Sequence, residues 1–508
     1  MADSKREIER KYEATDVTRL PDLSRVAGVS AVDHPGVSEL DAVYYDTEDL
    51  RLAAGSLTLR RRTGGDDAGW HLKFPVATGI RDEIRAPLSD TLPPELAALI
   101  RSRVRDAEIV PVVRLRSARD VHHLTGPDGG LLAEVSVDRV RAERLHGGSG
   151  TASWTEIEAE LADGGDPAFL DAVERRLREA GVRPSASPSK LSRALAETRT
   201  GGKKHKGPAG SPVPRTAGDH VLAYVRLQIT AIVDLDPAVR RGLPDSVHRM
   251  RVATRRLRSA LRTYRKILDR TVTGPVTEEL KWLAAELGVD RDQEVLGERL
   301  RTRLDGLPRT LVLGPVRGRL RTWSVVRSTS SRHRAVAVLD GSRYLTLLAA
   351  LDALLAGPPL LPAAATPPGK ALPRALRKDH RRLAHRITHA LELPPGPERD
   401  LALHQARKAV KRARYAAEAA RPALGNPAGK SAKRLKAVQG VLGDHQDSVV
   451  AREALRALAV RAQLSGEPSF TWGLLYGQEE RTAAAREQEL PGVWARASRA
   501  LGRAAPER

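Results

Sequence analysis

The sequence predicts a multidomain α+β protein in which an N-terminal antiparallel β-barrel precedes an all-α pair of helical bundles. Three observations support this prediction. In residues 1–200, short runs alternate polar and apolar side chains and end at Gly, Pro or Asp, as strands do. The later residues are rich in Ala, Leu and Arg, as helices are. They also contain an internal repeat of about 155 residues, so we expect two similar bundles.

The change between the two parts falls at TGGKKHKGPAGSPVPRT, residues 200–216. Gly, Pro, Ser and Lys dominate this segment, and it has no apolar face, so we expect a flexible linker between domains at 1–199 and 217–500. A second Pro-rich segment, residues 356–373, cannot be a continuous helix. It separates the two repeats, which we place at about 217–355 and 372–500.

Composition excludes several classes of protein. The chain has 508 residues and no cysteine, which excludes disulfides and thiolate metal sites and favours a reducing, cytoplasmic setting. The charged start, MADSKREIERKYE, does not match a secretory signal. No run of about 18 uncharged apolar residues predicts a membrane span.

All of the excess positive charge lies in the second part. Residues 1–200 hold 29 basic and 34 acidic residues, a net charge of −5, whereas residues 201–508 hold 56 basic and 29 acidic residues, a net charge of +27. A field of this size attracts a polyanion. Aromatic residues make up only 3% of the chain, and platforms for single-stranded nucleic acid need aromatic rings. The composition therefore argues against nucleic acid and favours a polyanion without bases.

Charged residues recur at a spacing of two along the strand-like part, so that neighbours in each group share one face of a strand. The groups are Glu7, Glu9, Lys11; Arg60, Arg62; His71, Lys73; Arg81, Glu83, Arg85; Arg114, Arg116; Glu134, Asp138; and Glu156, Glu158, Glu160. A solvated face explains a single strand of this kind. Three alternate glutamates, however, repel one another unless a cation lies among them. Carboxylates suit Mg²⁺ or Mn²⁺ and guanidinium groups suit phosphate, so the pattern predicts an enclosed site for a metal–phosphate complex.

The EIERK motif, with Glu7, Glu9 and Lys11, resembles the ExExK signature of the CYTH family, also called triphosphate tunnel metalloenzymes. The likeness continues in order through YYDTEDLRLAAGSLTLRRR, GWHLKFP, RDEIRAPL, LLAEVSVDRV, TEIEAEL and Ser189-Lys190. The resemblance implies an eight-stranded antiparallel tunnel barrel. It also implies a reaction in which a metal-activated water attacks the terminal phosphoryl group.

The resemblance also implies roles for single residues. The expected phosphate contacts are Lys11, Arg60, Arg62, Lys73, Arg85, Arg114, Arg116 and Lys190. The expected ligands of Mg²⁺ or Mn²⁺ are Glu7, Glu9, Glu158 and Glu160, with Glu156 and Asp138 nearby. The motif leaves open which two of the three C-terminal glutamates bind the metal. His71 is either a tunnel residue or merely polar lining, and Arg81 is compatible with an ordinary surface charge.

The repeat in the helical part carries a basic stripe twice. VHRMRVATRRLRSALR begins at Val247, and LHQARKAVKRARYAAE begins at Leu403. Residues three and four apart share a helix face. The stripes are His248, Arg251, Arg255, Arg258 and Arg262 in the first copy, and His404, Arg407, Lys411 and Arg414 in the second. The first copy has no acidic residue from Val247 to Lys266, and like charges repel at this spacing, so anion binding is favoured over a solvated face.

A second signature follows each stripe, LGVDRDQEV from Leu287 and LGDHQDSVV from Leu442, which pairs Gly288 with Gly443 and Asp292 with Asp447. We expect the two aspartates to hold stripe arginines. The paired stripes and signatures resemble the CHAD domain, the conserved histidine α-helical domain. This resemblance implies two four-helix bundles whose stripes face a common groove that binds polyphosphate.

Three functional hypotheses follow. The leading one is an enzyme that hydrolyses inorganic triphosphate or short polyphosphate in the tunnel, while the helical domain captures polyphosphate. The second is a non-catalytic protein that attaches to polyphosphate granules. The third keeps the tunnel but changes its substrate to thiamine triphosphate, or to ATP for cyclisation, because the motif recognises phosphates and metal rather than the organic group.

Overall fold

The computed structural model of the chain describes residues 3–199 and 213–503, without the side chains of residues 289–294, 325–332 and 500–503. The chain divides into two compact units, Met1–Gly210 and Ser211–Arg508. Most of the predicted linker, residues 200–212, lies outside the described residues. Within the described part, no helix is long and apolar enough to cross a membrane.

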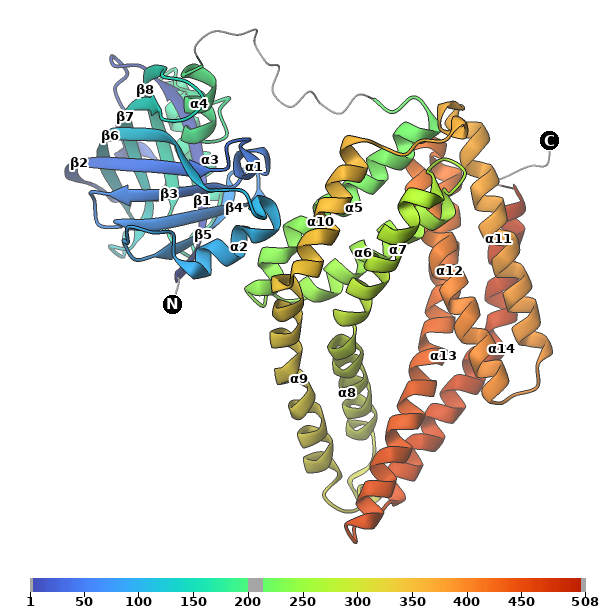
Figure 1. The fold of residues 1–508 in the computed structure, drawn as a ribbon. Helices are drawn as coiled ribbons and strands as arrows, with labels where there is room; N and C mark the ends of the chain where they lie inside the picture. Colours follow the sequence, from blue (N-terminus) through green and yellow to red (C-terminus); the bar gives the residue numbers. More distant parts are fainter. Residues whose placement is uncertain (1–2, 200–212, 504–508) are drawn as a thin grey trace. The chain divides into compact units, whose positions relative to one another are not determined.

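The first unit is built on one antiparallel sheet that closes on itself (Figure 1). Its strands are β1 Asp3–Ala14, β2 Ala31–Asp46, β3 Thr58–Thr63, β4 Gly69–Ala77, β5 Ile80–Ala86, β6 Val110–Thr125, β7 Leu131–Arg144 and β8 Thr151–Leu161. They lie in the order β5-β4-β3-β2-β6-β7-β8-β1, and pairing of β1 with β5 closes the barrel. A short ninth strand, β9 (Arg183–Pro184), also pairs with β1. The predicted eight-stranded barrel is therefore confirmed.

Four helices cover the barrel: α1 (Arg51–Ala54), α2 (Pro94–Val104), α3 (Ala168–Glu179) and α4 (Lys190–Glu197). Helices α2 and α3 pack apolar side chains against the outer faces of the strands. Helix α4 packs differently, because its Leu191 and Ala194 join a cluster with inward-facing residues such as Tyr44 and Leu115. This helix therefore fills one end of the barrel with apolar side chains and brings Lys190, its first residue, to the interior.

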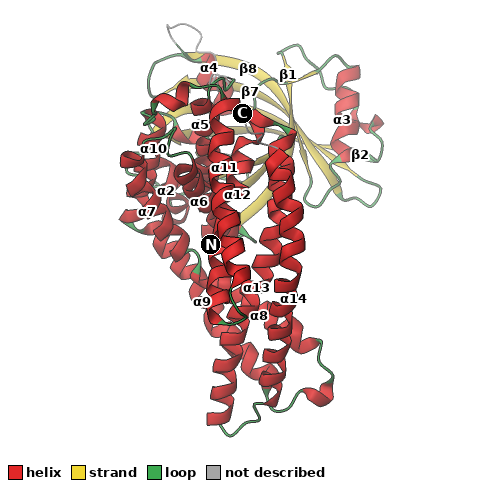
Figure 2. Cartoon of the chain, turned by 90° about the vertical axis from the view of Figure 1, so that its right-hand side faces the viewer, coloured by secondary structure: helices red, strands yellow, loops and turns green. Residues whose placement is uncertain are grey.

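The second unit consists of helices (Figure 2). The first half holds α5 Ala217–Arg240, α6 Ser246–Thr263, α7 Arg270–Glu286, α8 Val289–Asp305, α9 Val316–Asp340 and α10 Ser342–Ala356. The second half holds α11 Pro368–Glu392, α12 Pro397–Leu424, α13 Asn426–Leu464 and α14 Phe470–Arg503. The pairs α7–α8 and α9–α10 correspond to the single long helices α13 and α14, so each half has four helical rods. The predicted pair of four-helix bundles is confirmed.

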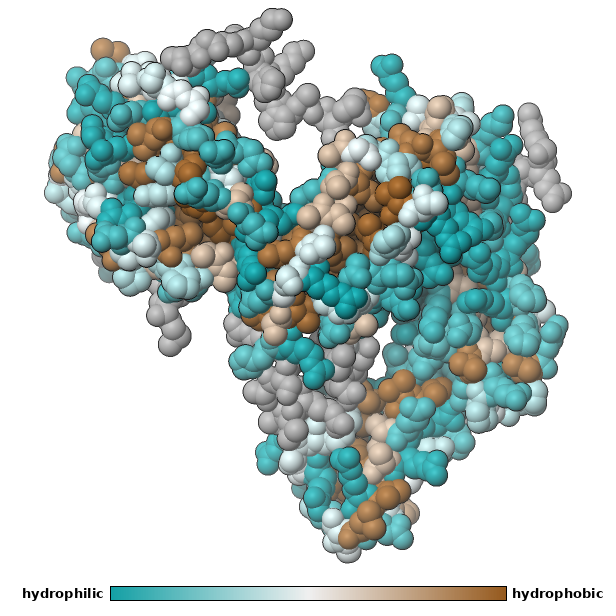
Figure 3. Space-filling view, in the orientation of Figure 1, coloured by the Kyte–Doolittle hydropathy of each residue, from teal (hydrophilic) through white to brown (hydrophobic). Residues whose placement is uncertain are grey.

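Each bundle has its own apolar core, and a third core joins the far ends of α8, α9, α13 and α14. Helices α6 and α12, which carry the two basic stripes, lie side by side where the bundles meet. On the face shown in Figure 3, hydrophobic residues gather over the first bundle, whereas the visible surface of α11 and α12 is mainly hydrophilic.

Candidate functional site

A cavity of about 170 Å³ lies inside the barrel, and all eight strands contribute to its wall. Its lining residues are Lys5, Glu7, Glu9, Lys11, Tyr44, Thr58, Arg60, Arg62, Asp67, Lys73, Arg81, Arg85, Arg119, Glu134, Glu158, Glu160, Ser189, Lys190 and Leu191. Nine of them are basic and six are acidic. The two-residue spacing of charges in the sequence therefore reflects side chains that point into one enclosed volume.

The two glutamates of the EIERK motif are buried against lysines. Glu7 accepts a hydrogen bond of 2.5 Å from Lys73 Nζ, and Glu9 lies 3.3 Å from Lys11 Nζ. Burial raises the pKa of Glu7 to about 7, although Lys73 opposes this shift. Burial would also raise the pKa of Glu9, but Lys11, Lys73 and Arg81 together outweigh it and hold that pKa below its usual value. Glu9 is thus an anion that a cation holds in place.

Lys190 fills a group of three buried carboxylates. Its Nζ lies 2.9 Å from Asp138, 2.8 Å from Glu156 and 2.5 Å from Glu158. One oxygen from each carboxylate lies within 4.8 Å of the others, so the group has the dimensions of a cation site. Asp138 and Glu156 do not line the cavity, and the ammonium group of Lys190 stands where a metal ion would bind them. Of the predicted acidic ligands, Glu158 faces both this group and the cavity.

Glu83 organises the cationic wall opposite. It is fully buried, accepts a hydrogen bond of 2.5 Å from Arg85 Nε and lies 3.3 Å from Lys73 Nζ. His71 Nδ1 donates a hydrogen bond of 2.9 Å to the same carboxylate, its Nε2 lies 2.9 Å from the main-chain oxygen of Asp67, and burial lowers the pKa of His71 to about 4. His71 therefore stands behind Glu83 and does not line the cavity.

Two arginines of β3 offer donors to an anion. The Nε atoms of Arg60 and Arg62 are buried and have no hydrogen-bond partner among the described residues. Burial, together with the nearby charges of Arg60 and Arg119, lowers the pKa of Arg62 to about 9. A buried N–H group without a partner is costly, so these donors favour an incoming oxygen anion.

The structure does not bring Arg114 and Arg116 into the cavity. Both lie on the outer face of β6, where Arg114 donates to Asp41 at 2.5 Å and Arg116 lies 3.6 Å from the same carboxylate. Between them, Leu115 points inward against the apolar plug of α4. The two arginines share one face of β6, as their spacing requires, but this is the outer face and not the face that lines the cavity.

Arg119 takes the inward position on β6. It donates to Asp138 with two bonds of 2.8 Å and to Glu158 at 2.7 Å. The sequence-based assignment also missed Lys5, which is in phase with Glu7, and it left Arg81 as compatible with an ordinary surface charge. Both line the cavity, and Arg81 Nε lies 3.7 Å from Glu9. The sequence carried a signal for both, because Lys5 lies two residues before Glu7 and Arg81 lies two residues before Glu83.

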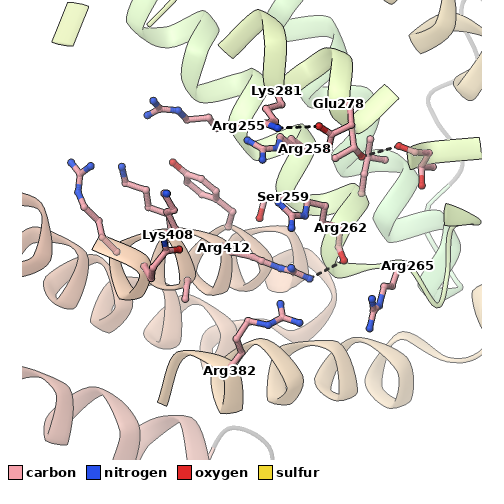
Figure 4. Close-up of a pocket in the computed structure, with 18 of the residues that line it drawn as sticks. Arg255, Arg258, Ser259, Arg262, Arg265, Glu278, Lys281, Arg382, Lys408 and Arg412 are labelled. Atoms are coloured by element: carbon pink, nitrogen blue, oxygen red, sulfur yellow. Dashed lines mark hydrogen bonds and ion pairs between the residues drawn. The ribbon is translucent and has the colours of Figure 1, made fainter. Parts of the chain in front are cut away.

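A larger groove of about 1070 Å³ lies between the two helical bundles (Figure 4). Its lining residues are Arg255, Arg258, Ser259, Leu261, Arg262, Arg265, Arg270, Thr273, Gly274, Thr277, Glu278, Lys281, Arg382, Arg386, His404, Gln405, Arg407, Lys408, Ala409, Lys411, Arg412 and Tyr415. Twelve of these are Arg or Lys, and only Glu278 is acidic. The stripes of α6 and α12 therefore face one another across a common basic groove.

Arginines on both walls of the groove have different partners. On α12, Arg412 donates to Asp379 at 3.0 Å and to the main-chain oxygen of Arg262 at 2.8 Å, which fastens the two bundles together. On α6, the buried Nε of Arg258 has no hydrogen-bond partner among the described residues. Burial lowers the pKa of Arg258, and the charge of Arg262 lowers it further. Figure 4 shows Arg255, Arg258 and Arg262 on one side and Arg382 and Lys408 on the other.

Six of the nine predicted stripe residues line the groove: Arg255, Arg258, Arg262, His404, Arg407 and Lys411. His248 is exposed and Arg251 is buried, and neither lines it. Arg414 turns away to Glu418 at 2.8 Å and Gln439 at 3.0 Å.

The expected aspartate contacts are found in one copy. Arg407 lies 3.5 Å from Asp447. The side chain of Asp292 lies outside the described residues. His404 shares a hydrogen bond of 2.6 Å with Gln446, and burial lowers its pKa. Both halves contribute basic residues to the groove, and the second half also contributes its histidine.

Comparison with known proteins places the two units in two families. Residues 5–194 match the model of the CYTH domain, and residues 223–456 match the model of the CHAD domain. Two uncharacterized proteins of Mycobacterium tuberculosis, MT2285 and Rv2226, are each 38% identical over 98% of this chain and 97% of their own length.

Solved structures resemble the units separately. PptA from Streptomyces chartreusis, 22% identical with a TM-score of 0.47, covers 56% of this chain and 100% of its own. The CHAD domain from the plant Ricinus communis, 25% identical with a TM-score of 0.43, covers 56% of this chain and 92% of its own. HpAC1 from Hippeastrum is a putative adenylyl cyclase that is described as having a dominant triphosphatase activity. It is 18% identical with a TM-score of 0.23, and it covers 38% of this chain and 97% of its own.

The inward and outward arginines of β6 should differ in their effect on stability. We expect Arg119→Met to lower the free energy of unfolding by ~3 kcal/mol, because it removes a cation from buried carboxylates. Arg116→Met should change it by less than ~0.5 kcal/mol, because that side chain lies on the outer face. Urea unfolding of the full chain measures both values. Equal effects would contradict the orientation of β6.

Proposed function

Because this chain belongs to the family of proteins in which a CYTH domain precedes a CHAD domain, we propose that its barrel hydrolyses inorganic triphosphate or short polyphosphate with Mg²⁺ or Mn²⁺. We further propose that the basic groove between its helical bundles binds polyphosphate. The observation that carries the first proposal is the cavity inside the barrel, where buried carboxylates and unpartnered guanidinium donors face one another.

The donor set fits a divalent metal ion. Glu7, Glu9, Glu158 and Glu160 all face the cavity and offer the hard oxygen ligands that Mg²⁺ and Mn²⁺ prefer. The position of Lys190 among three carboxylates supports the same conclusion, because it shows that this wall accepts a cation. When bound, the metal would supply charge neutralisation and a more acidic water.

The residues of the chain would then act by exchanging partners. Lys11 and Lys73 contact the glutamates of β1, and a metal–triphosphate complex would offer a new partner to each side. The lysines would then bind phosphate oxygens, as would the unpartnered donors of Arg60 and Arg62. Positioning and neutralisation of charge are the main tasks of a protein in phosphoryl transfer.

The lining also supports an inorganic substrate. Among the described residues of the cavity, Tyr44 is the only aromatic side chain and Leu191 the only aliphatic one. A site for an adenine or thiamine ring would need more apolar surface than this. The cavity volume of about 170 Å³ agrees with a small, highly charged occupant.

Glu9→Gln should abolish metal-dependent hydrolysis of triphosphate. Removal of a residue that only supports a metal ligand costs ~10–100-fold in activity. Loss of a direct ligand should therefore lower kcat/KM by more than this. Glu13→Gln is the matched control, since Glu13 shares the face of Glu9 but binds Arg193 at 3.0 Å outside the cavity. Turnover by wild-type protein in EDTA, or full activity of Glu9→Gln, would contradict the proposal.

Arginines at equivalent positions of the two repeats should differ in polyphosphate binding. Arg258 lines the groove and Arg414 does not, although their sequence positions match. We expect Arg258→Ala in the full chain to weaken binding of long polyphosphate several-fold and to lower the slope of log affinity against log salt by about one. Arg414→Ala should change neither value. Titration of fluorescent polyphosphate at several salt concentrations tests this, and equal losses would indicate a diffuse basic surface.

The groove should serve the tunnel only for long substrates. A chain held on the groove raises the local concentration of its ends near a tunnel on the same polypeptide. We therefore expect the double variant Arg258→Ala/Arg262→Ala to retain wild-type kcat/KM for triphosphate and to lose activity on long polyphosphate. Phosphate release from both substrates measures this. Unchanged activity on long chains would favour the alternative role in attachment to polyphosphate granules.

A further inference from the structure

Two histidines and an aspartate meet on the outer face of the barrel, outside the tunnel. Asp120 and His122 are two residues apart on β6 and share the face opposite to Arg119. His34 comes from the neighbouring strand β2. Its Nε2 lies 2.5 Å from Asp120 Oδ1, and His122 Nε2 lies 3.8 Å from the same oxygen. The imidazole rings of His34 and His122 stack with their centres 4.7 Å apart.

The local sequence explains how the three side chains come together. The pairing of β2 with β6 is regular up to Asp33 and resumes at Gly36, so His34 and Pro35 face a single residue of β6. Proline cannot donate to the ladder, and Gly36 has a φ of +110°, which favours glycine. A bulge of this kind increases local twist and redirects a side chain. It turns His34 over the two ligand-bearing residues of β6.

We propose that His34, Asp120 and His122 form a binding site for a borderline divalent metal ion of the Zn²⁺ class. The three candidate ligand atoms lie within 4.8 Å of one another, and ligands about 2.0–2.1 Å from a tetrahedral metal lie ~3.4 Å apart, so small rotations bring them into place. Two imidazoles and one carboxylate are a donor set for Zn²⁺ rather than for Mg²⁺. The side chains are 53%, 34% and 21% exposed, which leaves an entry path and an open position for water.

Another three-residue group, with one histidine and two carboxylates, already has its charges balanced. His445 lies 3.3 Å from Asp400 and 3.1 Å from Glu487 in the second helical bundle. There the carboxylates already bind Arg452 and Arg399 at 2.8 Å and 3.0 Å, so the charges are balanced without a metal. Within the described part of the chain, Asp120 forms ion pairs with the two histidines and with no lysine or arginine.

A metal at the outer site would fasten β2 to β6 where the shift in register interrupts their hydrogen bonds. The next residue of β6, His123, lies 3.5 Å from Glu134, which lines the tunnel. The two faces of this short segment therefore serve different sites. The metal would stabilise the pairing of β2 with β6, which is a structural role. It would bind independently of the Mg²⁺ or Mn²⁺ of the tunnel.

The test uses the full chain in excess Mg²⁺, which occupies the oxygen ligands of the tunnel. Titration with Zn²⁺ by calorimetry, and with Co²⁺ by visible absorption, compares wild type with His34→Ala/His122→Ala. The matched control is His385→Ala/His389→Ala, which removes two exposed histidines on α11. We expect the first variant to lose one equivalent of Zn²⁺ and the Co²⁺ bands of a four-coordinate site, and the control to retain both.

A second measurement separates loss of the metal from loss of the fold. Zn²⁺ should raise the melting temperature of wild type and of the control, as a ligand that binds only the native state does. It should not raise that of His34→Ala/His122→Ala, whose melting temperature without metal should match wild type because the substituted side chains are on the surface. Equal Zn²⁺ stoichiometry in wild type and the double variant would overturn the proposal. Asp120→Asn should weaken Zn²⁺ binding at least ~10-fold, and unchanged affinity would exclude the carboxylate as a ligand.

Discussion

The closed barrel depends on compensation of the charges that it encloses. Fifteen acidic and basic side chains line a volume of about 170 Å³, and each would be costly to bury alone. Strand alternation brings acids and bases to the same interior, where Lys73, Lys11 and Lys190 each contact carboxylates from other strands. The pairing compensates the buried charges and also gives every group a partner that it can exchange for another of opposite charge.

The helical groove follows a different rule. Twelve basic residues face it with one acidic residue among them, and the buried Nε of Arg258 lacks a partner among the described residues. Apolar cores on both sides hold the stripes together despite their repulsion. The tunnel is thus internally neutralised, whereas the groove is left to an external anion. One chain therefore offers two kinds of phosphate site, one for a compact metal complex and one for an extended polyanion.

Sequence patterns predicted the walls of both sites but not all of their members. The two-residue spacing predicts that Arg114 and Arg116 share one face of β6. Only the packing of Leu115 against α4 shows that this face is the outer one. The contacts of Lys190 with Asp138 and Glu156 depend on how α4 enters the barrel, which local sequence does not encode. In the helical half, the repeat makes His248 and His404 equivalent, yet His404 lines the groove and His248 is exposed outside it.

The same glycine has different structural consequences in the two repeats. Gly288 separates α7 from α8, whereas its counterpart Gly443 lies inside the uninterrupted 39-residue helix α13. A further break at Gly341 divides α9 from α10, where the second repeat has the single helix α14. Two repeats with the same sequence signatures therefore differ in backbone continuity. The first half is interrupted at two glycines, whereas the second half spans the corresponding positions with continuous helices.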